Sequence, residues 1–515
     1  MTDLLDEKPH RSWRDSVRAF LSPKVIALLF LGFSAGVPIL LVFSTLSLWL
    51  SDAGVERATI GFFSWAALAY SFKVVWAPLI DKMPVPVLFH MMGRRRSWLL
   101  VAQIAIVAAL TFIALHDPQE HLTWMAFGAL ALAFSSATQD IVIDAYRIEA
   151  ADEDLQGLMA ASYIMGYRIG MIVAGAGALE IAGMLEVVPG YDYNAWSWTY
   201  LAMGAVMGIG MITTFVISEP EVGEARKLDT YNASQYLRFF AVFALAATMF
   251  AGVFFFSSDI TVAAKAALHD VGFITELAAI SVEAVRLLLA VLAAVTVGVA
   301  LVKAHLAPRQ LMVEAYVEPF AEFFSRYGRV ALLILALVAT FRISDVVMGV
   351  MANVFYDDLG FSKQEIGRIT KLFGLVMTIT GGFLGGLLTV RYGVMKTLFI
   401  GGVMVALTNA LFAVLAGMGP DIRMLATVIA ADNLSAGIAS AAFVAYLSSL
   451  TAKGYTATQY ALFSSMMLLL PKLIAGYSGM VVDSVGFAVF FIGAAVIGII
   501  PLILIVFAAR HTAKP

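Results

Sequence analysis

The sequence GVERATIG at residues 54–61 has a counterpart in GFSKQEIG at residues 360–367. Each copy follows the aromatic-rich end of one apolar segment and opens the next apolar segment. The recurrence predicts that the chain is built from two related halves.

The apolar segments are long enough to cross a membrane. The chain has 515 residues, of which 61% are hydrophobic and only 13% are charged, with a mean hydropathy of +0.89. Apolar stretches of about 18–20 residues are typical of membrane-spanning helices, and their length excludes a barrel. We expect fourteen such helices, at roughly 24–50, 59–80, 97–115, 123–146, 156–183, 196–217, 238–257, 284–303, 329–356, 364–390, 395–417, 422–450, 456–483 and 485–508.

The repeat divides these segments into two bundles of six helices and a central insertion. Two parallel six-helix repeats are the plan of major facilitator transporters. We therefore expect an all-α membrane protein with the major facilitator fold and two extra transmembrane helices. The expected parts are a cytoplasmic segment 1–23, an N-terminal bundle 24–217, a linker 218–328 with the extra helices, a C-terminal bundle 329–509 and a tail 510–515.

Basic loops predict the orientation and a structural motif. The loop PLIDK at 78–82, followed by GRRR at 93–96, and the loop GGLLTVRYG at 385–393 resemble the basic Gly-x-x-x-Asp-Arg-x-Gly-Arg loop of that superfamily. We expect structural roles for Asp81, Arg94 and Arg95. Cytoplasmic loops carry an excess of Lys and Arg, so this pattern predicts that both termini are cytoplasmic.

Nine charged side chains fall inside expected membrane helices. A charge in the bilayer costs roughly 2.5–3.5 kcal/mol on insertion scales, so such residues usually face a polar cavity, pair with one another, or move protons and substrates. They are Lys73, Asp140, Asp144, Arg168, Arg342, Asp345, Lys371, Asp432 and Lys472. Their distribution over both halves predicts a pathway between two bundles.

The acids are candidates for proton coupling, and Asp140, Asp345 and Asp432 are the residues expected to carry it. Asp140 and Asp144 lie one helical turn apart on one face. The alternative for Asp140 is a static salt bridge with Lys73 or Arg168. Asp144 and Arg147 are expected to form a structural pair at the helix end, and Arg342 and Asp345 could pair in the same way.

The basic, amide and aromatic residues are candidates for substrate binding. A guanidinium group matches a carboxylate with two parallel hydrogen bonds. Aromatic faces stack on sugar rings, although a position in the interfacial belt is the alternative for any tryptophan. The expected substrate-binding residues are Lys73, Gln139, Arg168, Lys371, Asn433, Lys472, Trp49, Tyr70 and Tyr163.

Several classes of protein lack support in the sequence. The chain has no cysteine, which excludes disulfides, zinc–thiolate sites and thiol nucleophiles. It has no nucleotide-binding or hydrolase motif, so we expect neither an enzyme nor a cofactor or metal site. The expected partners are a substrate, protons and the lipid bilayer, with no nucleic acid and a monomeric state.

Several of these strings resemble the AmpG muropeptide permeases. The most specific is SATQDIVIDA at 136–145, and GYRIGM at 166–171 and ATQYAL at 457–462 add to the similarity. The resemblance implies an inner-membrane symporter that imports anhydromuropeptides from periplasm to cytoplasm with protons. These compounds, GlcNAc-1,6-anhydro-MurNAc with or without peptide, are cell-wall turnover products whose recycling is linked to β-lactam resistance. The long insertion and Asp432, where glutamate is expected, depart from the family pattern.

Two other functions remain open. The first is transport of acetyl-CoA or another bulky organic anion, because related transporters share the broader pattern. The second is a scaffold or sensor without transport, which would not require so many charges inside the membrane.

Overall fold

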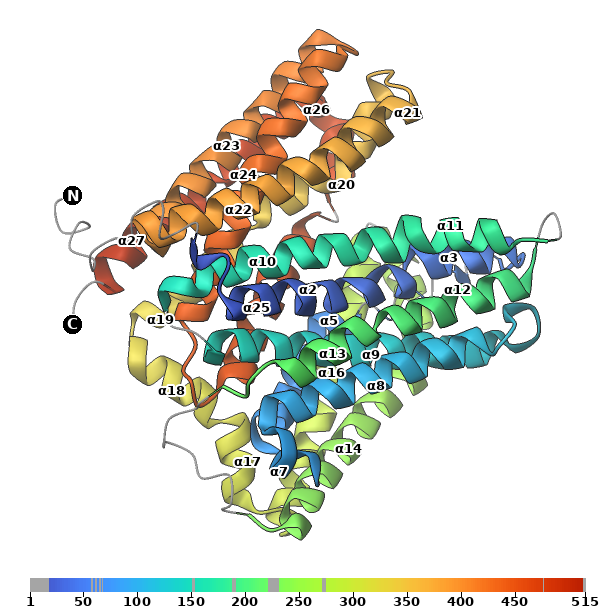
Figure 1. Cartoon of the computed structure of the whole chain (residues 1–515), viewed down its shortest axis with the longest axis vertical. Helices are drawn as coiled ribbons and strands as arrows, with labels where there is room; N and C mark the ends of the chain where they lie inside the picture. The colour runs from blue at the N-terminus through green and yellow to red at the C-terminus, as the bar shows by residue number, and fades with distance from the viewer. Residues whose placement is uncertain are drawn as a thin grey trace. The chain divides into compact units, whose positions relative to one another are not determined.

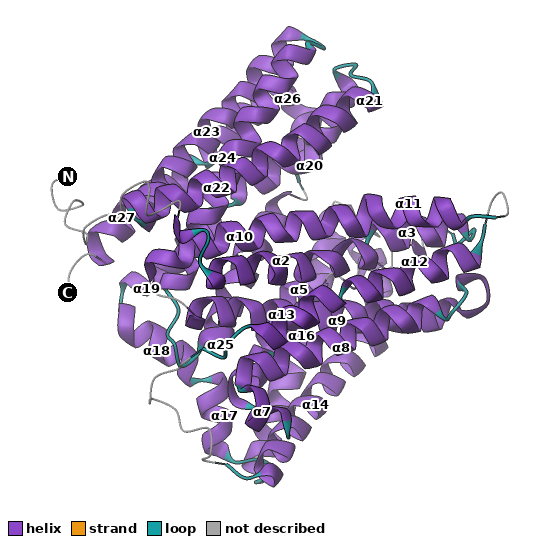
Figure 2. Ribbon diagram, viewed as in Figure 1, coloured by secondary structure: helices purple, strands orange, loops and turns teal. Residues whose placement is uncertain are grey.

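The computed structural model describes residues 18–56, 59, 60, 63, 66, 68–150, 153–187, 191–220, 231–270, 275–475 and 477–512. The described residues form helices and loops without strands (Figure 2). The chain divides into two compact units. Met1–Gly223 and Phe323–Pro515 make up the first unit, and Glu224–Glu322 makes up the second, within the expected linker 218–328.

Both halves of the repeat lie in the first unit. The first half contains α2 (Pro23–Val42), α3 (Ser44–Asp52), α5 (Leu68–Phe72), α6 (Ala77–Lys82), α7 (Leu88–Met92), α8 (Arg94–Ala114), α9 (Pro118–Ala150), α10 (Glu153–Ile172), α11 (Ala178–Leu185), α12 (Tyr193–Val206) and α13 (Gly208–Val216). The second half contains α19 (Val330–Thr340), α20 (Ile343–Asp358), α21 (Lys363–Ile366), α22 (Gly374–Tyr392), α23 (Val394–Met418), α24 (Ile422–Ser449), α25 (Thr456–Ala475), α26 (Ser478–Ile497) and α27 (Ile499–Thr512).

Twelve helices in the described chain are long and apolar enough to cross a membrane, so the expected fourteen are not confirmed. The two that are missing were expected at 59–80 and 456–483. Several residues at the start of the first stretch lie outside the described chain, and the remainder is broken into α5, a 3₁₀ turn at Lys73–Val75 and α6. In the second stretch, α25 ends at Ala475 and α26 begins only at Ser478.

The backbone repeats at the turns that the sequence repeat predicts. Gly54 and Gly360 both have positive φ angles, 77° and 91°, in the turns that close the first helix of each half. Gly93 and Gly393, with φ angles of 81° and 83°, precede α8 and α23. Because L side chains rarely adopt this conformation, glycine at these turns is a backbone requirement. Residues 57, 58 and 61 of the first sequence copy lie outside the described residues.

Glycine also allows the closest helix contacts in each half. The helices α2 and α10 run alongside one another (Figure 1). A Cβ atom at Gly166 would lie 1.9 Å from the Leu29 carbonyl oxygen, and one at Gly36 would lie 2.0 Å from that of Tyr167. In the second half, a Cβ atom at Gly381 of α22 would lie 2.1 Å from the Leu434 oxygen of α24. Small residues allow such close approach in lipid, where no hydrophobic force drives helices together.

The second unit consists mainly of a helical hairpin. Its helices are α14 (Ala233–Phe256), α15 (Ser258–Asp270), α16 (Thr275–Lys303), α17 (Arg309–Tyr316) and the start of α18 (Glu318–Tyr327). The long helices α14 and α16 pack against each other. Glu283 accepts hydrogen bonds from Lys265 at 2.6 Å and from Arg286 at 3.2 Å. These ion pairs tie the start of α16 to the short helix α15.

The glycine contact between α2 and α10 predicts a sharp difference between two alanine substitutions. Gly166→Ala forces α10 away from the Leu29 carbonyl, and overpacking of this kind typically costs about 1–3 kcal/mol. We expect a lower thermal unfolding temperature for the purified chain in detergent. Gly417→Ala is the matched control, because no atom lies within 4 Å of the added Cβ in α23. Equal unfolding temperatures for the two variants would contradict the interpretation.

Candidate functional site

Buried ions surround Asp81 at one end of the first unit. Arg95 Nη2 donates to Asp81 Oδ1 at 2.9 Å, and Arg95 Nε donates to Glu149 Oε2 at 2.8 Å. Arg94 Nη1 donates to the Asp81 carbonyl at 2.9 Å. The side chains of Asp81, Arg95 and Glu149 are at most 1% exposed. We call the end of the unit that carries these three residues the basic end.

Asp81 also joins the two halves, because it accepts hydrogen bonds from the N-terminus of α25. The donors are Ala457 N at 3.1 Å, Thr458 N at 2.8 Å and Thr458 Oγ1 at 2.8 Å. A carboxylate satisfies the free N–H groups of a helix N-terminus and interacts favourably with its dipole. Burial acts to raise the pKa of Asp81, but the guanidinium groups of Arg95 and Arg94 outweigh it and hold that pKa below its usual range.

Further contacts at the basic end join the same halves. Glu149 accepts a hydrogen bond from Thr456 Oγ1 at 2.7 Å. Arg147 Nη1 donates to Ser448 Oγ at 2.6 Å, and its guanidinium group lies over the Tyr460 ring at 5.1 Å. These bonds connect the C-terminal end of α9 to α24 and α25.

The helices α10 and α22 also meet at the basic end. A Cβ atom at Gly157 would lie 2.7 Å from Thr389 Cβ, and one at Gly386 would lie 3.0 Å from Ala161 Cβ. Together with the polar bonds, these contacts close the first unit at its basic end.

A chain of charges runs inward from this end along α9. Arg147 Nη2 and Asp144 Oδ1 are 3.4 Å apart, and Asp144 Oδ2 and Lys73 Nζ are 3.6 Å apart. Asp144 and Arg147 therefore form the expected ion pair, but Lys73 pairs with Asp144 and not with Asp140. Lys73 lies in a 3₁₀ turn and is 8% exposed. Its burial argues against extension to the membrane surface.

Asp140 lies one turn further along α9 and is incompletely satisfied. Its side chain is buried, and its Oδ1 atom has no hydrogen-bond partner among the described residues. Lys73, Asp144 and Tyr163 are its electrostatic neighbours, and Tyr70 and Tyr167 also lie close to it. A buried carboxylate oxygen without a partner carries a desolvation cost, which protonation removes.

The second half holds a pair of acids. Asp345 lies in the first turn of α20, and Asp432 lies within α24. The two carboxylates are electrostatic neighbours, Arg342 lies near Asp345, and Thr408 lies within hydrogen-bonding reach of Asp432. The structure contains no ion pair between Arg342 and Asp345, both of which are described. Two neighbouring carboxylates favour sharing a proton over ionising together.

Three other predicted residues present cations without a carboxylate partner among the described side chains. Arg168 is half-buried on α10, and its only side-chain contact is with Met171 Sδ, at 4.0 Å. Lys371 is exposed, and its Nζ donates to Asn353 Oδ1 at 3.4 Å. Lys472 is also exposed. Lys371 lies in a π-helical turn, Gly367–Phe373, a feature that often marks functional positions.

Three predicted binding residues have polar groups that are already used in helix packing. Gln139 is fully buried, accepts from Ser34 Oγ at 3.0 Å and donates to the Ser34 carbonyl at 3.1 Å. Trp49 is fully buried and stacks on Trp196, with the ring centroids 5.9 Å apart. Asn433 Oδ1 accepts from Thr378 Oγ1 at 2.7 Å. Tyr70 and Tyr163, by contrast, lie beside Asp140.

The sequence analysis did not single out several residues of the basic end. They include Glu149, Ser448, Thr456 and Thr458. A threonine at the start of an apolar segment is a helix N-cap signal, and it could have indicated the end of α25. Nothing in the sequence indicated which acid would bind there.

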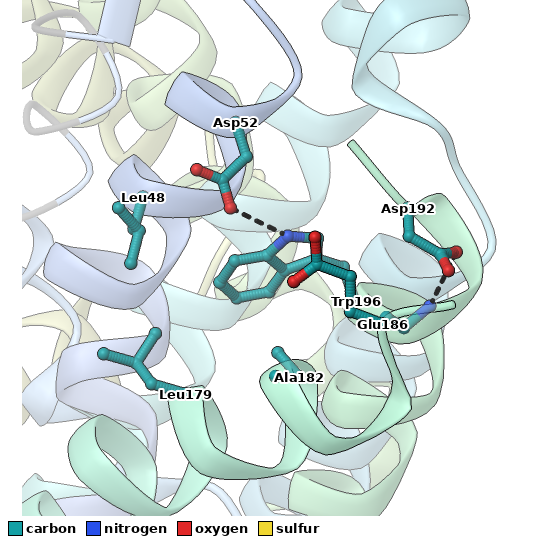
Figure 3. A pocket seen from close by; sticks show the side chains of 9 residues that line it. Leu48, Asp52, Leu179, Ala182, Glu186, Asp192 and Trp196 are labelled. Carbon is teal, nitrogen blue, oxygen red and sulfur yellow. Dashed lines mark hydrogen bonds between the residues drawn. The ribbon is translucent and has the colours of Figure 1, made fainter. Parts of the chain in front are cut away.

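A small acidic pocket lies away from these charges, between α3, α11 and α12 (Figure 3). Asp52 Oδ2 accepts from Trp196 Nε1 at 3.2 Å, and Glu186 lies beside this pair. The volume is about 190 Å³. That is below the roughly 300 Å³ at which small-molecule pockets begin. No group of acidic or histidine side chains in the described chain has the arrangement of a metal site.

The fold is that of the major facilitator transporters. A structure entitled "Crystal structure of a Major Facilitator Superfamily (MFS) transporter, FucP, in the outward conformation" matches with a TM-score of 0.59 and 11% identity, over 95% of this chain and 99% of that one. The proton:xylose symporter XylE, bound to a sugar derivative, matches with a TM-score of 0.53 and 10% identity, over 96% and 95%.

Sequence relatives confirm the expected resemblance to the AmpG permeases. A "Putative transporter AmpG 4" of Rickettsia felis is 29% identical over 95% of this chain and 97% of its own length. The "Anhydromuropeptide permease" of Escherichia coli K12 is 28% identical over 95% of this chain and 80% of its own length. The family described as "Acetyl-coenzyme A transporter 1" matches residues 24–187. The protein is therefore a multi-pass membrane transporter and not an enzyme, as expected.

The cap that Asp81 forms on α25 predicts a change in access at the basic end. Asp81→Asn leaves Arg95 without one of its buried charge partners, and breaking such a pair typically costs about 3–5 kcal/mol. Because the chain contains no cysteine, a Thr389→Cys substitution provides a single reporter thiol at the α10–α22 contact. We expect a maleimide to label this thiol about tenfold faster or more in the Asp81→Asn background.

The exposed Asp483 of α26 provides the control, because Asp483→Asn removes an acid that makes no such contact. Size-exclusion chromatography checks that each variant remains folded. Equal labelling rates in the Asp81→Asn and Asp483→Asn backgrounds would show that the cap does not hold the basic end closed.

Proposed function

We propose that the protein is a proton-driven symporter that imports anhydromuropeptides from the periplasm to the cytoplasm for cell-wall recycling. The substrates are GlcNAc-1,6-anhydro-MurNAc with or without its peptide. The relatives named above support this class of substrate. The observation that carries the proposal for coupling is the buried carboxylate of Asp140, whose Oδ1 atom has no hydrogen-bond partner beside the Lys73–Asp144 pair.

The proposed orientation makes the basic end cytoplasmic, in a bacterial inner membrane with both termini on the same side. Arginine-rich loops favour this orientation. The contacts of Asp81 with α25 then close the cytoplasmic side, so the described conformation corresponds to an outward-facing state of alternating access. A monomer suffices, because each half supplies its own set of charges.

The chemistry of the substrate matches the groups that lack fixed partners. Its sugar rings can stack on Tyr163 and Tyr70, and its carboxylates can bind Arg168, Lys371 and Lys472. Gln139 and Trp49 are left out of this binding site, because their polar groups hold the first half together. Asn433 positions α24 against α22 through Thr378.

Proton coupling is assigned first to Asp140. When Asp140 is ionised, its charge competes with Asp144 for Lys73, and when it is protonated, Lys73 belongs to Asp144 alone. A proton taken up from the periplasmic side therefore changes how the Lys73 ammonium is shared within the first half. The neighbouring acids Asp345 and Asp432 could hold a proton in the second half in a related way.

Uptake into proteoliposomes tests both parts of the proposal. We expect labelled GlcNAc-1,6-anhydro-MurNAc to accumulate under an inward proton gradient and an uncoupler to abolish the accumulation. Asp140→Asn is neutral at every pH, so it should reduce concentrative uptake at least about tenfold while substrate exchange across the membrane persists. Glu180→Gln on α11, which removes an exposed acid, should leave uptake unchanged.

The outcomes separate the substrate from the coupling residue. Uptake that is insensitive to the uncoupler would refute proton symport. Full gradient-driven uptake by Asp140→Asn would move coupling away from this residue, and the same assay on Asp345→Asn and Asp432→Asn would then locate it.

The match of residues 24–187 to an acetyl-CoA transporter family favours a second candidate, transport of acetyl-CoA or another bulky organic anion. Such a substrate needs cations and an aromatic face for adenine but no buried acid. Competition distinguishes the two substrates. For a muropeptide transporter, excess unlabelled muropeptide displaces the labelled muropeptide and acetyl-CoA does not, and the reverse result would favour the second candidate.

A further inference from the structure

Two arginines from opposite halves lie near one another within the first unit. Arg168 belongs to α10 of the first half, and Arg342 lies between α19 and α20 of the second half. Their guanidinium groups are close enough to interact electrostatically. Both side chains are half-buried. Two like charges in this position repel one another, and the low-dielectric surroundings strengthen the repulsion.

Neither arginine has an ion-pair partner among the described residues. Arg168 contacts only the sulfur of Met171. Asp345 is the acid near Arg342, three residues along the chain, but it does not form an ion pair with it. The arginines of the basic end, by contrast, are bonded to carboxylates at 2.9 Å or less. Arg168 and Arg342 are therefore cations that the protein itself does not neutralise.

Both arginines are carried by well-braced backbone. Gly166 and Gly170 flank Arg168 and pack α10 directly against the backbone of α2. Just after Arg342, Ser344 Oγ donates to the Ala494 carbonyl at 2.7 Å, which attaches the start of α20 to α26. Rigid supporting elements hold binding groups more precisely than loops do.

The helices are also interrupted at these positions. The regular helix around Arg168 ends at Ile172 and continues as a π-helical turn, Val173–Gly177. The break between α19 and α20 falls at Arg342 itself. Discontinuous helices near the middle of the bundles are typical of substrate sites in transporters of this architecture.

We infer that Arg168 and Arg342 together bind one carboxylate group of the substrate and so form a clamp between the two halves. This inference rests on the proposed function, since a muropeptide is the carboxylate-bearing ligand considered. A single carboxylate neutralises both guanidinium groups and accepts hydrogen bonds from each. It replaces the repulsion between the halves with attraction, so the anion both binds and draws α10 towards α20.

Matched acid and amide ligands test the clamp on the purified full-length protein. The probes are GlcNAc-1,6-anhydro-MurNAc with its free carboxylate and the same compound as the neutral amide. Hydrogen bonds to a charged group favour the acid, and we expect the wild type to bind it about 10- to 100-fold more tightly than the amide. Arg168→Gln and Arg342→Gln should each lose most of this preference while binding of the amide changes little.

The double variant Arg168→Gln/Arg342→Gln gives a sharper criterion. Because both arginines act on one carboxylate, the second substitution should add little to the first. Arg168→Lys should recover part of the preference, since it keeps the charge but lacks the planar fork. Arg423→Gln, in the exposed first turn of α24, should retain the full preference. Unchanged binding of the amide shows that the variants remain folded.

The outcomes keep the clamp and the proposed function distinct. Muropeptide uptake by the wild type without a preference for the acid overturns the clamp and leaves the function standing. If the wild type neither binds nor imports either muropeptide, the proposed function fails, and N-acetylmuramic acid and its amide replace them as probes. A preference for that acid that both arginine variants lose would support an anion clamp, and no preference would overturn it. Independent, additive losses in the double variant would also overturn it.

Discussion

The carboxylate of Asp81 is the point at which the two halves of the transporter are joined. It sits between Arg95 of its own half and the N-terminus of α25 in the other half. Each of its oxygens is bonded, and its immediate charged partners are themselves bonded to Glu149. A buried charge in this setting is stable only while every partner is present. The contacts between α10 and α22 can pack closely because this polar cluster holds the basic end together.

This arrangement divides the charges of the protein into two groups. At the basic end, acids and bases are paired within hydrogen-bonding distance, as in the bond between Glu149 and Thr456. Further along the helices, Asp140, Arg168 and Lys371 lack such ion pairs among the described residues. The first group stabilises one conformation. The second group carries a free-energy cost that a proton or a substrate can remove, which is the property a transport pathway requires.

The sequence predicted the architecture well because its signals are local. The two halves follow from the octapeptide repeat, and the positive-φ glycines Gly54 and Gly360 reproduce that repeat in the backbone. Helix number was harder to predict, because mean apolar character does not reveal the break at Lys73 or the end of α25 at Ala475. The expected pairing of Asp144 with Arg147 depends only on helical spacing, and it is present.

Predicting the site from sequence was less reliable because it depends on which face of each helix meets its neighbour. Gln139 adjoins Asp140 in the sequence, but it points to Ser34 of α2, and Trp49 stacks within an aromatic cluster. Composition gives no indication of either orientation. The proximity of Arg168 and Arg342 joins positions far apart in the chain, and no periodicity within one helix predicts it.

Alternating access requires the two halves to separate at the basic end, and the structure makes the cost of this step specific. Opening removes the carboxylate cap from α25 and exposes Thr456 and Thr458 to a different environment. A symporter must therefore gain comparable stabilisation elsewhere before it opens, because a ligand shifts an equilibrium only by its differential affinity for the two states. An anion held between Arg168 and Arg342 supplies such a contribution only when the opposite ends approach. Proton binding at Asp140 acts on the Lys73–Asp144 pair in the first half, next to the basic end. The two events act on neighbouring parts of one structure, so neither the proton nor the substrate alone needs to offset the whole cost of opening.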